Sequence, residues 1–105
     1  MDFKTPAERL GLDEDEYIEL VELFLETGGN DLKGLEEALS KNDATTAVER
    51  SHSIKGAAGN LGITDIYEKA KDIETQAREN NLDGIENTVE EIKKYFENIS
   101  AALGN

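Results

Sequence analysis

Apolar residues recur in steps of four and three over the C-terminal part of the chain, and this spacing constrains the fold more than any other feature. They are Ile85, Val89, Ile92, Phe96, Ile99 and Leu103. The spacing places them on one face of an α-helix and predicts a seam that packs against other helices. The chain has 105 residues, 37% hydrophobic, with a single proline. We therefore expect a single all-α domain over residues 1–105.

Capping signals divide the rest of the chain into further helices. Thr5, followed by Pro6 and Glu8, is typical of a helix start with a capping box, and Asp13 of a second start. We expect this second helix to stop at the segment TGGND, residues 27–31, with a shorter helix after it.

Asp43 is expected to cap a helix that runs to about Leu61 and stops at Gly62, and Thr64 to cap the next one. The apolar stripe of that next helix consists of Ile66, Tyr67, Ala70, Ile73 and Ala77. Amphipathic helices with short connections predict an antiparallel (up-down) four-helix bundle with a short extra N-terminal helix.

The formal net charge of −13 argues against nucleic acid and against an anionic membrane surface as partners, because both require basic clusters. The chain has no cysteine, which excludes disulfides and thiolate metal sites. It also lacks a long apolar run and a signal peptide. We expect a cytoplasmic protein, and a monomer because the bundle uses the apolar seam of the last helix.

The segment SHSIKGAAGNLG, residues 51–62, contains the only histidine of the chain and three glycines. On a helical wheel the buried stripe consists of Ala47, Ser51, Ile54, Ala58 and Leu61. His52 then points to solvent and shares an exposed surface with Lys55, Gly56 and Gly59.

A glycine inside a helix costs about 1 kcal/mol relative to alanine, so Gly56 on a solvent-facing position needs a reason. We interpret it as clearance for another protein that docks beside the imidazole. For Gly59, close packing between helices is the competing interpretation, and Gly62 is expected only to end the helix. A metal site at His52 lacks a second His or Cys, and Glu49 is the nearest acid on this face.

An exposed imidazole, largely neutral at pH 7, can act as a nucleophile and carry a group covalently. Lys55 lies one turn away and can offer an ammonium to an anionic cargo such as a phosphoryl group. The stretch HSIKGAAGNLG, residues 52–62, resembles the motif of the histidine-containing phosphotransfer (HPt) family. The resemblance extends over the whole chain and implies a helical bundle that carries phosphoryl between proteins of a two-component phosphorelay.

The resemblance implies that His52 is phosphorylated, that Lys55 neutralises the phosphate, and that Gly56 and, more weakly, Gly59 permit docking. The partners would be receiver domains of response regulators or hybrid histidine kinases, and a receiver would supply the Mg²⁺. Because the acidic chain would meet acidic receiver sites, we expect an apolar contact surface near His52 that includes Val48. No nucleotide-binding signature is present, so the chain is expected to carry phosphoryl without autokinase activity.

Two other functions remain open at this stage. The chain could be a non-catalytic bundle that binds receivers without carrying phosphate, although the complete set of His52, Lys55 and Gly56 favours the carrier. It could also be an acidic mimic of nucleic acid, although its acids surround every helix instead of forming a stripe. The sequence leaves open the cognate kinase and receivers, the pathway output, the direction of phosphoryl flow, and whether these residues are a complete protein or one domain of a longer kinase.

Overall fold

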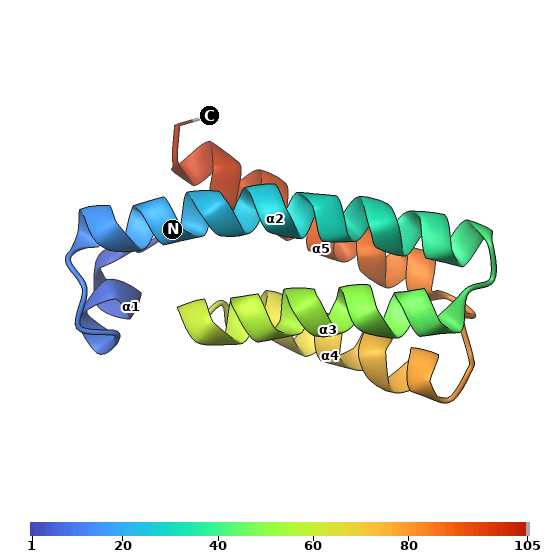
Figure 1. The fold of residues 1–105 in the computed structure, drawn as a ribbon. Coiled ribbons are helices and arrows are strands. Elements are labelled where there is room, and N and C mark those ends of the chain that lie inside the picture. The colour runs from blue at the N-terminus through green and yellow to red at the C-terminus, as the bar shows by residue number, and fades with distance from the viewer. Residues whose placement is uncertain (105) are drawn as a thin grey trace.

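The computed structural model describes residues 1–104, and these residues form five helices and no strand. The helices are α1 (Lys4–Arg9), α2 (Glu14–Ser40), α3 (Ala44–Leu61), α4 (Thr64–Arg78) and α5 (Ile85–Ala102). The predictions of an all-α fold and of a short N-terminal helix are therefore confirmed. Figure 1 shows α1 folded beneath the first turns of α2, with the other helices running alongside one another.

Each of the four long helices packs against two of the other long helices. α2 and α4 both contact α3 and both contact α5, while α1 contacts α2. The helix that carries the histidine, α3, therefore has α2 on one flank and α4 on the other, and its remaining surface faces outward (Figure 1).

Three of the predicted helix ends are correct. Asp13 caps α2 through a capping box with Glu16, and the Asp43 carboxylate accepts a hydrogen bond from the Thr46 amide at the start of α3. Gly62 ends α3 in the left-handed conformation, with φ of 72°, which glycine adopts without a steric penalty.

Two predicted caps are wrong. α1 begins at Lys4, before Thr5, because the Asp2 carboxylate accepts hydrogen bonds from the amides of Lys4 and Thr5. Thr64 is the first residue of α4 and not its cap, since the N-cap is Ile63 and no side chain caps this helix. The N-cap lies two residues before Thr5 in α1 and one residue before Thr64 in α4.

The predicted stop at residues 27–31 is also wrong, because α2 continues through Gly28 and Gly29. Gly28 is buried, and a Cβ built on it would lie 2.8 Å from Cζ of Phe96 on α5. The bare backbone at Gly28 thus lets the Phe96 ring pack against α2, where it also meets the ring of Phe24 at 5.2 Å between centroids. This tertiary contact outweighs the low helix propensity of the glycine pair.

The predicted buried stripe of α3 is confirmed at every position, since Ala47, Ser51, Ile54, Ala58 and Leu61 are its buried residues. The hydroxyl of Ser51 donates to the backbone oxygen of Ala47, so the one polar member of the stripe is satisfied inside the core. The stripes of α4 and α5 also face the core, although Tyr67, Phe96 and Leu103 are only half-buried.

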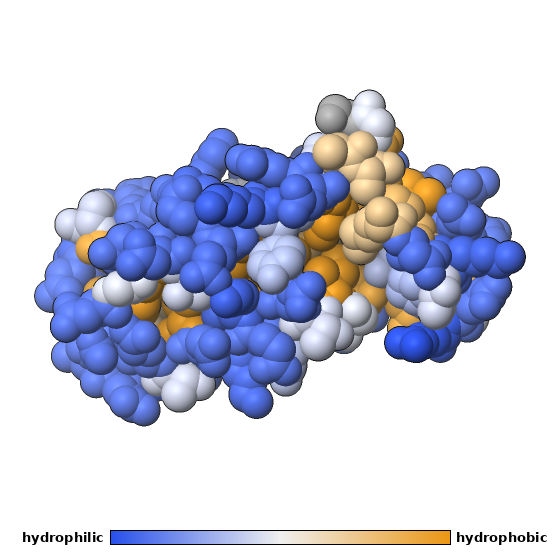
Figure 2. All heavy atoms as spheres, turned by 180° about the vertical axis from the view of Figure 1, so that it is seen from behind, coloured by the Kyte–Doolittle hydropathy of each residue, from blue (hydrophilic) through white to orange (hydrophobic). Residues whose placement is uncertain are grey.

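Hydrophilic side chains cover most of the rear face, and apolar atoms show near the C-terminal end of α5 (Figure 2). Within residues 1–104, no helix is long and apolar enough to cross a membrane.

Candidate functional site

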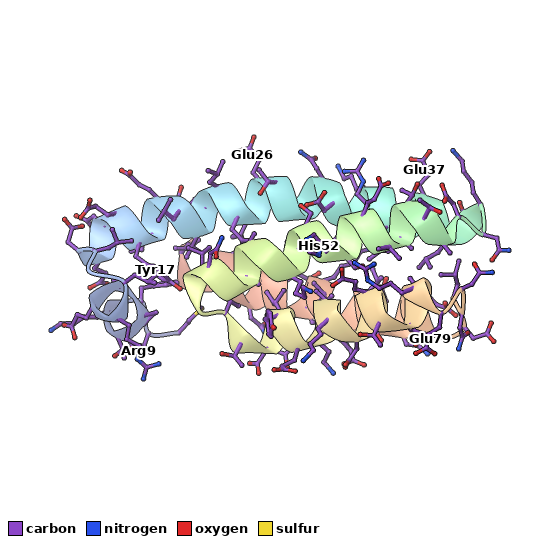
Figure 3. All side chains as sticks on the ribbon, turned by 60° about the horizontal axis from the view of Figure 1, so that its bottom comes forward. Arg9, Tyr17, Glu26, Glu37, His52 and Glu79 are labelled. Atoms are coloured by element: carbon purple, nitrogen blue, oxygen red, sulfur yellow. The ribbon has the colours of Figure 1, made fainter. Side chains whose placement is uncertain are left out.

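His52 lies on the outward surface of α3, with 62% of its side chain exposed (Figure 3). The side chains next to it point to the two flanking helices. On the side of α2, the Ser53 hydroxyl donates to the Asp31 carboxylate at 2.7 Å. On the side of α4, the Lys55 ammonium contacts Glu74 at 2.6 Å. These contacts fix the rotation of α3, and the predicted outward orientation of His52 is confirmed.

The main group beside His52 is Glu74, a carboxylate on α4 that the sequence analysis did not identify. Only 5% of its side chain is exposed. Its Oε2 lies 2.8 Å from Nδ1 of His52 and 2.8 Å from a guanidinium nitrogen of Arg78, and its Oε1 lies 2.6 Å from Nζ of Lys55. A buried carboxylate with three donors is fully compensated, so it can remain ionised inside the α3–α4 interface.

The electrostatics of Glu74 determine which nitrogen of the imidazole carries the proton. Burial alone would raise the pKa of this carboxyl, but hydrogen bonds from Lys55, Arg78 and His52 outweigh burial and lower its pKa from 4.5 to about 2. An ionised carboxylate can only accept hydrogen bonds, so Nδ1 of His52 must be the donor. In the neutral ring the lone pair then lies on Nε2, which is the other ring nitrogen.

Lys55 differs from its prediction. The wheel placed it on the exposed surface with His52, but only 25% of its side chain is exposed, because its ammonium turns inward to Glu74. The prediction considered α3 alone and therefore omitted the neighbouring helix. For the same reason Glu49, the nearest acid on this face of α3, was the one acid considered, whereas Glu74 of α4 is in direct contact with His52.

A signal for Glu74 was present in the sequence. It lies at the edge of the apolar stripe of α4, one position after Ile73 and one turn before Arg78. An acid at the border of a buried stripe, followed four residues later by a cation, is a candidate for a partly buried ion pair. Its partner on another helix could not be read from this pattern.

The predicted docking residues occupy different environments. A Cβ on Gly56 would meet no atom within 4 Å, so the surface beside His52 is open there. A Cβ on Gly59 would lie 3.3 Å from the Tyr67 ring, which favours helix packing as the reason for that glycine. Val48 is half-buried in a hollow between α3 and the end of α4.

An apolar groove lies on the opposite flank of α3, where it meets α2. The groove is lined by Leu20, Leu23, Phe24, Thr27, Ala57, Asn60 and Leu61. Leu20 and Leu23 are 42% and 55% exposed, which is high for leucine, and every residue of the lining is uncharged. The groove is thus an uncharged apolar surface on a chain with a net charge of −13.

No cluster of three or more His, Cys, Asp or Glu side chains suited to a metal ion occurs within residues 1–104. At His52 the one adjacent carboxylate is already occupied by Lys55 and Arg78. The acids of this chain do not form a metal-ligand set there.

Comparisons with known proteins agree with this geometry. The sequence model of the family described as Hpt domain matches residues 19–102, which include the whole of α3, α4 and α5. Among solved structures, the chain is similar to histidine-containing phosphotransfer protein B (HptB) from Pseudomonas aeruginosa PAO1. The TM-score is 0.81 at 27% sequence identity, and the match covers 94% of this chain and 86% of the other. No curated protein matches the chain.

The chain therefore belongs to the Hpt domain family, as the motif predicted, and is a histidine phosphotransfer protein of a phosphorelay. Members of this family are phosphoryl carriers that interact with receiver domains of two-component systems. An exposed imidazole held by a buried carboxylate on a convex helix suits that chemistry.

Proposed function

We propose that His52 carries the phosphoryl group on Nε2 and passes it between receiver-domain aspartates, or from a histidine kinase to a response regulator. The observation that supports this most is the contact of 2.8 Å between Nδ1 and the buried Glu74, which leaves the Nε2 lone pair for attack. His52 is the only histidine in the chain.

In the transfer to His52, the Nε2 lone pair forms a P–N bond while the P–O bond of the donor acyl phosphate breaks, and its electron pair leaves on the aspartate carboxylate. The proton on Nδ1 stays in place, so the imidazole ring becomes positively charged. Glu74 offsets this charge, as the buried aspartate of a Ser-His-Asp triad does for its histidine. The reverse steps on a second receiver return His52 to the neutral ring.

Charge compensation for the carried phosphoryl group comes in part from Lys55, which lies one turn from His52. We propose that the receiver domain supplies the Mg²⁺ that the transfer needs.

The chain would act in the cytoplasm as a phosphoryl carrier without autokinase activity. Residues 1–105 would form a single domain and a monomer. The four long helices of this domain would form an up-down bundle.

Docking would place the receiver over Gly56, where the absence of a side chain lets a partner approach His52. Gly59 and Val48 would lie at the margin of the contact. The apolar groove of Leu20 and Leu23 would bind an apolar part of the receiver surface, because a chain of net charge −13 gains little from contact with an acidic receiver site.

Incubation with a phosphorylated receiver tests the carrier function directly. Phosphoryl should move to the chain as an acid-labile, base-stable adduct, and His52→Gln should abolish the labelling while circular dichroism shows an intact helical fold. If the wild-type chain binds the receiver yet takes up no label, the chain is a non-catalytic binding bundle and the carrier proposal is wrong.

A second experiment tests the docking groove. Leu23→Glu should weaken receiver binding about tenfold or more, because it buries an unpaired charge in the interface. Leu10→Glu is the matched control, since Leu10 is 45% exposed but lies after α1. Equal affinities of the two variants would contradict the groove as the contact surface.

A further inference from the structure

Arg78 lies beside the imidazole, although the HPt motif does not include it. Its guanidinium contacts Oε2 of Glu74 at 2.8 Å, and Nδ1 of His52 contacts the same oxygen at 2.8 Å. The two nitrogens are therefore no farther apart than twice that distance. The Arg78 side chain is 61% exposed and stands at the last turn of α4.

Lys55 and Arg78 differ in how firmly Glu74 holds them. Lys55 is 25% exposed and contacts Oε1 alone, at 2.6 Å. If Lys55 left, the buried Oε1 would lose the one charged partner that residues 1–104 provide, which is costly for a carboxylate that is 5% exposed. If Arg78 left, Oε2 would keep the hydrogen bond from His52 and Oε1 the ion pair with Lys55.

Arg78 is the more exposed of the two cations, and Glu74 keeps Lys55 and His52 as donors without it, so exchange of the Arg78 partner costs less free energy than loss of Lys55 would. A guanidinium also presents five donors in a planar fork that matches phosphoryl oxygens, whereas an ammonium binds as a point charge. Within the described residues 1–104, one of these donors is engaged, in the hydrogen bond to Glu74.

We propose that Arg78 is the cation that binds the phosphoryl group on His52 directly, while Lys55 remains with Glu74 and compensates charge from inside the interface. This inference rests on the proposed phosphorylation of His52 and adds a phosphate-binding residue from α4. The phosphoryl oxygens take over the guanidinium donors as Arg78 turns away from Oε2.

The surroundings explain why such a cation is needed. Glu74 lies at one side of the ring, and Glu49 lines the hollow that also contains Val48 and Arg78. A phosphoryl dianion on His52 adds negative charge next to the Glu74 carboxylate, on a chain of net charge −13. Direct contact with the exposed guanidinium of Arg78 would compensate the charge of the phosphoryl group locally.

The first test observes the contact itself. The full-length chain is phosphorylated with phosphoramidate, which needs no receiver, and the side-chain Nε–H resonance of Arg78 is followed by NMR. We expect this resonance to shift when phosphohistidine forms in the wild-type protein, and the corresponding resonance of Arg9 to stay unchanged. An unshifted Arg78 resonance on a phosphorylated chain overturns the inference and leaves the function of His52 intact.

The second test measures how phosphoryl partitions between the chain and a receiver at equilibrium. Arg78→Gln should lower the phosphohistidine share about fivefold, the value of one charge-assisted contact at an exposed site, and Arg78→Lys should restore part of it. Arg9→Gln removes the same charge at the opposite end of the molecule (Figure 3) and should leave the partition unchanged.

The outcomes separate the two proposals. If Lys55→Gln lowers the phosphohistidine share while Arg78→Gln behaves like Arg9→Gln, Lys55 is the direct ligand and the inference is wrong. If the wild-type chain takes up no phosphoryl from either donor, the proposed function itself fails.

Discussion

At the scale of single residues, two helices contribute different groups to the site. α3 supplies the nucleophile and an open approach at Gly56, and α4 supplies the buried carboxylate that orients the ring. Three side chains donate to the Glu74 carboxylate, so the position of each donor constrains the positions of the other two.

Substitutions at Gly56 should separate stability from docking. Gly56→Ala should raise the free energy of unfolding by about 1 kcal/mol, because the position is an exposed helix interior with no atom within 4 Å of the new Cβ. Gly56→Glu should keep the fold but slow transfer from a phosphorylated receiver. Urea unfolding and transfer kinetics measure the two effects, and a normal transfer rate for Gly56→Glu would show that clearance is not required.

Glu74 should make stability depend on pH in the acid range. Its pKa is lowered to about 2 in the folded state, so its contribution is complete above the unfolded value near 4.5 and is lost as the pH falls toward 2. Between pH 6 and 2, the free energy of unfolding of the wild type should therefore fall by up to ~3 kcal/mol more than that of Glu74→Gln. Urea unfolding of both proteins across this range measures the difference. If the two free energies change in parallel with pH, the assigned ionisation of Glu74 is wrong.

At the scale of whole helices, the glycines of α2 and α3 make room on opposite sides of their helices, toward the core in α2 and toward solvent in α3. Gly28 faces the core and makes room for Phe96 of α5, whereas Gly56 faces solvent, and a Cβ there would meet no atom of residues 1–104 within 4 Å. A helix tolerates either glycine when a neighbour, inside or outside the molecule, needs the space.

The glycine pair of α2 offers a matched comparison. Gly29→Ala should stabilise the protein by about 0.5–1 kcal/mol, because a Cβ there meets no atom within 4 Å. Gly28→Ala should fail to give this gain, since its Cβ would lie 2.8 Å from the Phe96 ring. Thermal unfolding of both variants measures the difference, and equal gains would mean that the ring moves aside without cost.

At the scale of the whole molecule, the chain has a net charge of −13, and the Glu74 carboxylate at the site is compensated by two cations. Lys55 and Arg78 both contact Glu74, so two cations offset this carboxylate next to His52 on an acidic protein. The apolar groove of Leu20 and Leu23 adds an uncharged surface on the other flank of α3.

This charge distribution predicts how receiver binding depends on salt. If apolar contacts carry recognition, the equilibrium affinity should change less than about threefold between 0.05 and 0.5 M NaCl, while the association rate responds more strongly. Titration calorimetry and stopped-flow mixing measure the two quantities. A steep fall in affinity with salt would show that ion pairs dominate docking.

Local patterns were sufficient for most of the architecture. The stripe from Ala47 to Leu61, the Asp13 and Asp43 caps and the outward direction of His52 depend on spacing along one helix, and the chain carries that spacing itself. The motif also indicated the family, because its residues 52–62 lie within about three turns of one helix.

The remaining features required contacts between segments distant in the chain. Gly28 stays helical because Phe96 packs on it, and Lys55 turns inward because Glu74 lies on the helix beside it. Side-chain partners across a helix interface depend on the rotation and register of both helices, and neither quantity is encoded in the periodicity of one. The identity of the cation beside the imidazole therefore became visible only when α3 and α4 were packed together.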